Sequence, residues 1–215
     1  MDHGDSDDDL LEAWASGDSR AGAALVARYY ESIARFFVYR LGPDSEDLVQ
    51  ETFLGLQRSL PSFRRTCSVR IYLFKIARNQ LLTAIRDRVR DRARFDPSET
   101  TMAAVQPTPT ALLAASDDQK LLVAALRGLP IDVQIMLELH YWEQLKVREI
   151  AEVLDMNVNT IKARMSRGRR RLYQDIERLA ESKEQLETTL YRLSGWIAEL
   201  REELGADETD QDPPA

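Results

Sequence analysis

Cysteine, histidine and long apolar runs are all scarce in this sequence. Its 215 residues include one cysteine, Cys67, and two histidines, His3 and His140. A single cysteine excludes an intramolecular disulfide and a cysteine-rich metal site, and it fits a reducing cytoplasm. No apolar run approaches the ~18–20 residues that cross a bilayer, and the N-terminus is acidic where a signal peptide would be basic. We therefore expect a cytoplasmic chain without membrane insertion, and we expect it to hold no metal and no other cofactor.

Residues that could support catalysis are equally few. His3 lies in an acidic tail, and His140 falls on an apolar stretch beside aromatic residues, which is typical of a structural histidine. Cys67 lies among bases that could lower its pKa, but no histidine is near it in the sequence. No glycine-rich loop is present that would cradle a phosphate. The sequence therefore predicts no catalytic residues, and we expect that the chain is not an enzyme.

Charge is distributed unevenly along the chain, whose net charge is −7. Residues 1–18 carry seven acids and neither lysine nor arginine, whereas residues 64–94 carry ten bases against two acids. A second basic run, Lys162–Arg171, holds six bases and no acid, and twelve acids follow between Asp175 and Asp212. The second run could be a solvated helix face, but six like charges repel one another unless a polyanion binds. Two basic patches between acidic ends indicate a nucleic-acid-binding protein.

Hydrophobic periodicity predicts an all-α chain of two small helical domains joined by a flexible linker. We place a first domain at residues 1–94, a linker at 95–116, a second domain at 117–181 and a C-terminal amphipathic helical extension at 182–215. Pro, Ser and Thr replace the helical pattern in the linker, so we expect it to have little packing of its own. The expected helices cover about residues 8–14, 19–41, 45–60, 68–86, 117–127, 131–142, 147–154 and 158 onward.

The spacing of two short helices in the second domain predicts a helix-turn-helix motif. Three residues separate the helix Val147–Leu154 from the helix that begins at Val158. In such a motif the first helix braces the backbone and the second enters the major groove. Asn157 is a good N-cap, and Asp155 stands where many such turns have glycine. The residues expected to contact DNA are Arg148, Asn157, Asn159, Thr160, Lys162, Ala163, Arg164 and Arg167.

Three segments of the chain resemble a known family. Residues 44–54 resemble the helix with which extracytoplasmic-function sigma factors grip the clamp coiled coil of RNA polymerase. Residues 63–65 and 72–79 resemble the segment with which these factors read the upstream hexamer and melt the promoter. Residues 129–134, 149–154 and 159–167 resemble their second DNA-binding domain. The three motifs occur in the family's order, and the resemblance extends over about residues 8–180.

The resemblance implies a sigma factor that binds core RNA polymerase and directs promoter-specific transcription initiation. Its partners would be the polymerase clamp and promoter DNA, both double-stranded and melted, and the resemblance leaves open whether an anti-sigma factor is another. The implied polymerase-binding residues are Asp47, Gln50, Glu51, Phe53 and Leu54. The implied DNA-binding residues of the first domain are Arg64, Arg65, Tyr72, Lys75, Arg78, Asn79 and Arg86.

The chemistry of these residues agrees with those roles. A cationic groove with aromatic and polar side chains suits unstacked bases, and an exposed acidic helix suits a basic protein surface. Asp47 and Glu51 could instead be charges favoured by the helix dipole, and Phe53 and Phe74 also fit a buried core. Two positions depart from the family, which commonly has Trp in place of Tyr72 and an acid in place of Thr83.

The C-terminal extension carries an apolar stripe at near-heptad spacing, and the stripe permits two interpretations. It could dock on one of the chain's own domains or on a partner and so regulate promoter binding, or it could extend the second domain's core as a helical hairpin. An alternative function is a stand-alone helix-turn-helix regulator that dimerises through this helix, but that leaves the first domain unexplained. The stripe comprises Ile176, Leu179, Leu186, Leu190, Leu193, Ile197, Leu200 and Leu204.

Overall fold

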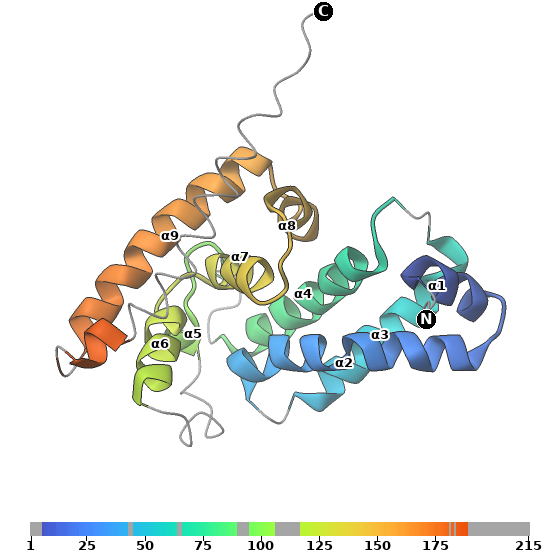
Figure 1. Cartoon of the computed structure of the whole chain (residues 1–215), viewed down its shortest axis with the longest axis horizontal. Helices are drawn as coiled ribbons and strands as arrows, with labels where there is room; N and C mark the ends of the chain where they lie inside the picture. Colours follow the sequence, from blue (N-terminus) through green and yellow to red (C-terminus); the bar gives the residue numbers. More distant parts are fainter. Residues whose placement is uncertain are drawn as a thin grey trace, which may run out of the picture.

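The computed structural model describes residues 6–42, 45–63, 66–89, 95–105, 117–180, 182 and 184–188, and these form two groups of helices (Figure 1). The first group contains α1 (Asp7–Ala15), α2 (Ser19–Leu41), α3 (Glu46–Ser59), the short 3-10 helix η1 (Leu60–Ser62) and α4 (Val69–Arg88). The second contains α6 (Asp117–Arg127), α7 (Ile131–Tyr141), α8 (Val147–Leu154) and α9 (Val158–Leu179), with the short α5 (Met102–Val105) before them. Within these ranges extended pairing is limited to an isolated bridge between Thr101 and Pro130, so the all-α prediction is confirmed.

Local chemistry sets the limits of the helices in the first group. The Asp18 carboxylate accepts a hydrogen bond from the Arg20 amide at 2.8 Å and caps α2. Gly42, with φ of 91°, ends the same helix in a conformation that favours glycine. The Ser68 hydroxyl caps α4 by accepting from the Ile71 amide at 3.3 Å. Because each cap is supplied by a neighbouring residue, these boundaries follow directly from the sequence.

Aromatic side chains form the centre of the first group's core. Phe36 lies edge-on to Phe37 and to Phe74, with ring centroids 5.5 and 5.8 Å apart, and all three rings are fully buried. A Cβ atom at Gly22 would lie 2.6 Å from the Trp14 indole, so glycine at this position lets α1 pack closely on α2. The core therefore fixes α1, α2, α3 and α4 relative to one another.

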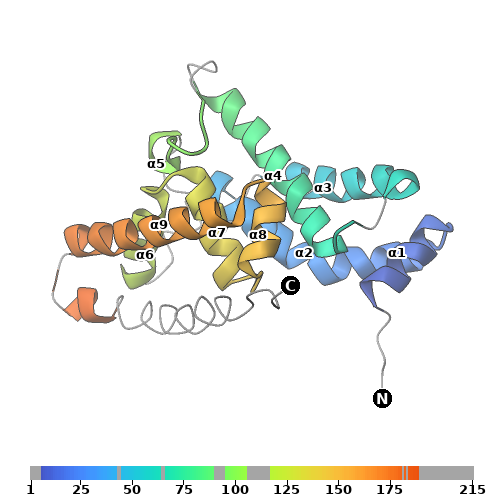
Figure 2. The same cartoon turned by 90° about the horizontal axis from the view of Figure 1, so that it is seen from above.

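In the second group, α7 is the central helix. Every residue from Ile131 to His140 is buried, including Asp132, Gln134 and Glu138. A helix that is buried all round lies in the interior of a protein, which agrees with the position of α7 between α8 and α9 in Figure 2. The His140 ring contacts the Leu145 carbonyl through Nδ1 at 3.1 Å, which is a structural role.

The first part of the segment between the domains is packed, contrary to expectation. Met102 is fully buried, and the carbonyls of Thr100 and Pro97 accept hydrogen bonds from the amides of Ile131 and Asp132 at 2.9 and 3.1 Å. The prediction of a linker with little packing is therefore wrong for residues 95–105. Composition was misleading here because one buried methionine and two backbone hydrogen bonds anchor an otherwise polar segment.

The two groups of helices pack against each other and share one core. α4 lies beside α8 in both views (Figures 1 and 2). The buried guanidinium of Arg127, on α6, donates to the carbonyls of Tyr39 and Arg40 at the end of α2, at 3.3 Å in each case. The same side chain donates to the Met102 carbonyl at 3.3 Å. Arg127 thus joins the second domain to the first and to the segment between them.

The described part of the C-terminal stripe begins on α9. Ile176 is buried, Leu179 is exposed, and Leu186, in the helical turn at 184–188, packs partly against the core. The rest of the predicted stripe, Leu190 to Leu204, lies outside the described residues. Among the helices in the described ranges, none is long and apolar enough to cross a membrane. No cluster of three or more His, Cys, Asp or Glu side chains suited to a metal ion occurs in those ranges.

Candidate functional site

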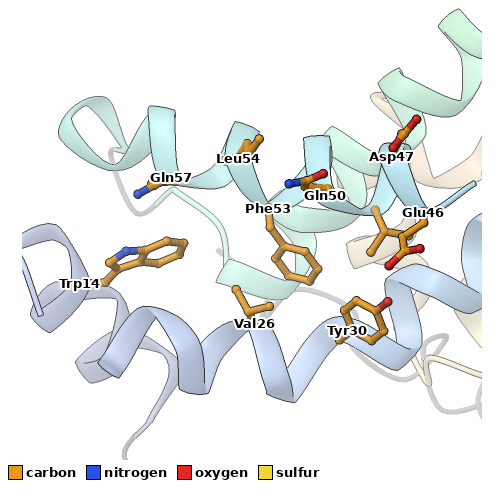
Figure 3. A pocket seen from close by; sticks show the side chains of 10 residues that line it. Trp14, Val26, Tyr30, Glu46, Asp47, Gln50, Phe53, Leu54 and Gln57 are labelled. Carbon is orange, nitrogen blue, oxygen red and sulfur yellow. The ribbon is translucent and has the colours of Figure 1, made fainter. Parts of the chain in front are cut away.

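A groove between α1, α2 and α3 contains most of the residues predicted to bind polymerase (Figure 3). Its volume is about 430 Å³. Asp47, Gln50, Phe53 and Leu54 of α3 line it, so four of the five predicted residues come together. Glu51 is exposed outside this lining and pairs with Arg58 of the same helix at 3.1 Å. The remaining lining residues are Trp14, Val26, Tyr30, Glu46, Val49 and Gln57.

The register of α3 explains this arrangement. Val49, Thr52 and Leu56 point into the core, which leaves Asp47, Gln50 and Leu54 on the outer side. Phe53 is only 7% exposed, and its ring points from α3 toward α2 in Figure 3. Phe53 is therefore mainly a core residue that also forms part of the groove wall.

Six groove residues were not among the predicted polymerase-binding residues, and three of the six lie on other helices than α3. Trp14, Val26 and Tyr30 come from α1 and α2, far from the motif on α3. Tyr30 is exposed, whereas its neighbour Tyr29 is buried in the core. An aromatic residue outside the buried apolar face of α2 was the one sequence signal that this helix contributes to a binding surface. Together these side chains give the groove an apolar floor, while Glu46 and Asp47 place carboxylates at one end. Such a surface can bind a partner that offers apolar and basic side chains.

The predicted DNA-binding residues of the first domain lie along α4. The Tyr72 ring packs on Phe63 with centroids 4.8 Å apart, and Lys75 and Arg78 are half-buried. Asn79 and Arg86 are exposed, and the Arg86 guanidinium lies 5.6 Å from the centre of the Phe95 ring. The other two predicted residues, Arg64 and Arg65, lie outside the described residues.

Arg78 faces the second domain. Burial lowers the pKa of its guanidinium, while the carboxylates of Asp132 and Asp155 act in the opposite direction and favour the charged form. Asp132 lies in the first turn of α7, and Asp155 lies in the turn between α8 and α9. A side chain predicted to bind nucleic acid is therefore beside two acids of the helix-turn-helix domain.

The helix-turn-helix turn has the predicted chemistry. Asp155 is left-handed, with φ of 54° and ψ of 49°, which confirms the expectation for this position. The Asn157 side chain caps α9 by accepting from the Asn159 amide at 2.8 Å. Lys162 is half-buried, and the exposed members of the predicted set are Arg148, Asn157, Asn159, Thr160, Ala163 and Arg167.

Arg164 is placed differently from the outward position expected of it. Its guanidinium forms an ion pair with Asp132, whose side chain is almost completely buried under α9. Burial raises the pKa of Asp132, and the Arg164 charge opposes that rise. The side chain of Arg164 therefore turns toward α7, and position along the helix alone did not reveal the carboxylate that attracts it.

The chain is similar to two sigma-factor families, each over one group of helices. Residues 25–91, from within α2 through α4, match the family "Sigma-70 region 2". Residues 119–172, from α6 into α9, match the family "Sigma-70, region 4". The first match contains the predicted α4 surface and most of the groove, and the second contains the helix-turn-helix.

Curated relatives and solved structures agree with these matches. The chain is 28% identical to the ECF RNA polymerase sigma-E factor of Haemophilus influenzae over 190 residues, which cover 81% of this chain and 97% of the relative. It is 28% identical to the factor of that name from Escherichia coli K12 over 179 residues, with coverages of 76% and 91%. The structure of CnrH in complex with the cytosolic domain of CnrY matches with a TM-score of 0.60 at 25% identity, covering 82% of this chain and all of that one. The sigma factor RpoE of Bartonella quintana, solved with the anti-sigma factor NepR, shares the fold with a TM-score of 0.56 at 24% identity, with coverages of 72% and 96%.

Proposed function

This chain belongs to the extracytoplasmic-function type of sigma factors, and we propose that it binds core RNA polymerase and directs promoter-specific transcription initiation in the cytoplasm. The observation that carries this proposal is that both family matches occur on one chain, with region 2 before region 4. The alignments also cover 97% and 91% of the two curated relatives. In this role the chain supplies binding surfaces and no catalytic group.

The α3 groove is the proposed contact with the polymerase. Its support is the combination of an apolar floor, the exposed side chains of Gln50 and Leu54, and the acids at one end. Carboxylates disfavour DNA, whereas they complement a basic protein surface. Phe53 contributes to this surface mainly by holding the wall of the groove in place.

The two basic surfaces are the proposed contacts with promoter DNA. On α4, Tyr72, Lys75 and Asn79 offer the aromatic, cationic and amide groups that hold unstacked bases, and Arg64 and Arg65 precede them in the sequence. On α9, Asn159 and Thr160 are exposed in the first turn after the cap, and Arg167 is exposed farther along the helix, which suits major-groove binding. A stand-alone repressor would leave the region 2 match unexplained. The family resemblance leaves open whether an anti-sigma factor is a further partner.

Run-off transcription tests this proposal. Overexpression of the chain, followed by mapping of the transcript ends that rise, supplies the promoter templates. Purified core polymerase with the chain should then yield transcripts of one length from these templates, whereas core polymerase alone should not. Templates with scrambled upstream sequence are the matched control. If the chain binds the mapped promoters tightly but never makes initiation by core polymerase specific, it is an operator-binding regulator and the proposal is wrong.

A further inference from the structure

The ion pair between Arg164 and Asp132 connects α9, the recognition helix of the helix-turn-helix, to the interior of its domain. The Arg164 guanidinium pairs with the Oδ2 atom of Asp132 on α7. The Asp132 side chain is 2% exposed, whereas the Arg164 side chain is 28% exposed. Among the described residues, the other carboxylate oxygen of Asp132, Oδ1, is buried without a hydrogen-bond partner. Asp132 is therefore a buried charge whose ion-pair partner comes from the DNA-binding helix.

Neighbouring contacts hold Asp132 in place. Its backbone amide donates to the Pro97 carbonyl at 3.1 Å, which ties the start of α7 to the segment 95–105. The next residue of α7, Val133, packs so closely on Gly168 of α9 that a Cβ atom at Gly168 would overlap it. Asp132 therefore cannot follow the Arg164 side chain if that side chain turns toward DNA.

Two adjacent contacts set the orientation of α9 on α7. Arg164 and Gly168 are four residues apart on one face of α9, and they meet the consecutive residues Asp132 and Val133. Four residues of helix rise by about 6 Å. Contacts at two points this far apart restrain the rotation of α9 about its crossing with α7, which a single contact would leave free. The pair thereby fixes the direction in which the exposed start of α9 points.

The energies of the alternatives decide where Arg164 lies when DNA binds. A buried ion pair that loses one partner is disfavoured by about 100-fold to several-thousand-fold. A bidentate contact between arginine and a base is worth about 5- to 150-fold, and one phosphate contact is worth about tenfold or less. Arg164 therefore stays with Asp132, although its place on the recognition helix favours a contact with DNA.

We propose that Arg164 does not contact DNA, and that Arg164 and Asp132 are positioning residues that fix how α9 enters the major groove. Phosphates and base edges are then contacted by other residues of this helix, among them the exposed Asn159, Thr160 and Arg167. The effect of the pair on promoter recognition rests on the proposed function of α9. An acid that is almost completely buried on α7 thus becomes a determinant of promoter recognition.

Three variants distinguish positioning from DNA contact. Arg164→Gln leaves the Asp132 carboxylate buried without its cation, and Asp132→Asn leaves the Arg164 guanidinium free to bind phosphate. The double variant Asp132→Asn/Arg164→Gln removes one charge of each sign, so it keeps the net charge of −7 and leaves neither charge of the pair unpaired. Arg167→Gln is the comparison variant, because Arg167 is an exposed arginine three residues farther along α9.

Urea denaturation of the free chain measures the pair itself. Arg164→Gln should raise the equilibrium constant for unfolding about 100-fold. The double variant should stay within about fivefold of the wild type, since removal of both charges leaves no buried carboxylate to be paired. Far-ultraviolet circular dichroism verifies that each variant keeps its helices. A double variant no more stable than Arg164→Gln would show that Asp132 does not depend on Arg164, and the proposal would be wrong.

The second measurement is the binding of promoter duplexes by the complex of the chain with core polymerase, compared with duplexes of scrambled upstream sequence. Anisotropy titrations at several salt concentrations give the promoter preference and the slope of the logarithm of the affinity against the logarithm of the salt concentration. Arg164→Gln should lose about tenfold of the preference with an unchanged slope, because α9 is displaced but no phosphate contact is lost. Asp132→Asn should steepen the slope by about 1, since it frees a guanidinium for phosphate.

The double variant decides between the two roles of Arg164. Positioning predicts that it recovers the promoter preference and the salt slope of the wild type to within about twofold and about 0.3, respectively. Arg167→Gln should weaken promoter binding about tenfold whether or not Asp132 is also replaced by asparagine. If the double variant binds promoter as poorly as Arg164→Gln, or if its slope falls in magnitude by about 1, Arg164 contacts DNA and the proposal is overturned. Failure of the proposed function would appear separately, as a wild-type complex that binds promoter and scrambled duplexes equally.

Discussion

Gly168 shows how a single residue sets the distance between the recognition helix and the interior. It lies on α9 where that helix crosses α7, and a Cβ atom there would come within 2.3 Å of Val133 Cγ1. Valine has few rotamers available in a helix, so it cannot move aside easily.

Gly168→Ala should therefore lower the free energy of unfolding by about 1–2 kcal/mol, although alanine favours helix by about 1 kcal/mol over glycine. Ser166→Ala, at an exposed position of the same helix, should be neutral or slightly stabilising. Urea denaturation measures both. A Gly168→Ala chain as stable as the wild type would mean that α7 and α9 do not approach as closely as described.

The pKa of the Cys67 thiol depends on the position of α8 relative to α4. Burial raises the pKa of its thiol above the ordinary value of 9.0, Lys75 lowers it, and the Glu152 carboxylate of α8 raises it. The neutral thiol is favoured, so at a given pH less reactive thiolate is present than on a free cysteine.

The rate of alkylation by iodoacetamide should accordingly rise with pH to a midpoint above that of the cysteine in a short, uncharged peptide with blocked ends. Glu152→Gln should shift the midpoint down, because a negative charge near the thiolate is removed. Glu149→Gln, one turn earlier on α8, is the charge-matched control. Identical profiles for Glu152→Gln and the wild type would contradict the proximity of α8 to the start of α4.

Among the helices, α3 is the one whose exposed residues we expect to bind core polymerase. Leu54 is exposed at the groove, so its truncation should leave the core intact, whereas truncation of Phe53 should cost about 3–5 kcal/mol of stability.

Leu54→Ala should weaken the affinity for core polymerase about tenfold, equivalent to about 1.4 kcal/mol, with an unchanged melting temperature. Competition against a labelled wild-type chain measures the affinity. Arg58→Ala on the same helix, outside the groove lining, should bind like the wild type. Equal affinities for Leu54→Ala and Arg58→Ala would remove the groove from the polymerase interface.

Substitutions on the recognition helix α9 should distinguish contacts with phosphate from contacts with base edges. Lys162→Ala should weaken the binding of all DNA duplexes alike by the complex of the chain with core polymerase, since lysine suits phosphate. The slope of the logarithm of the affinity against the logarithm of the salt concentration should fall in magnitude by about 1. Arg167→Ala should cost about 1–3 kcal/mol and relax the base preference at one position.

Anisotropy titrations of promoter duplexes at several salt concentrations distinguish these effects. Arg178→Ala removes the same charge from the far end of α9, where Arg178 pairs with Asp175 at 3.0 Å, and should change neither quantity. If it weakens binding as much as Lys162→Ala does, net charge and not the start of α9 governs the affinity.

For the whole molecule, the sequence predicted what depends on neighbouring residues. The helices follow from apolar periodicity, and Asp18, Ser68 and Asn157 cap them as short-range chemistry requires. Asp155 likewise adopts the left-handed conformation that its place in the turn predicted. The polymerase-binding candidates came from the family resemblance, and four of the five line one groove.

The contacts between the domains could not be predicted in this way. Glu143, between α7 and α8, pairs with Arg35 of α2 and Arg70 of α4, which lie 108 and 73 residues away, and no repeat in the sequence connects them. The one signal was the composition of α7, an apolar helix interrupted by Asp132 and Glu138, because acids in a buried helix require partners from elsewhere in the fold. The predicted DNA contact of Arg164 did not foresee its ion pair for the same reason, since its partner Asp132 belongs to another helix.

The most direct test of the account is a titration of the fluorescently labelled chain with purified core polymerase at modest salt, with residues 182–215 either present or deleted. A sigma factor should show saturable one-to-one association for at least one form, weakened about tenfold by Leu54→Ala. Absence of association for both forms would contradict it, whatever affinity the chain has for DNA.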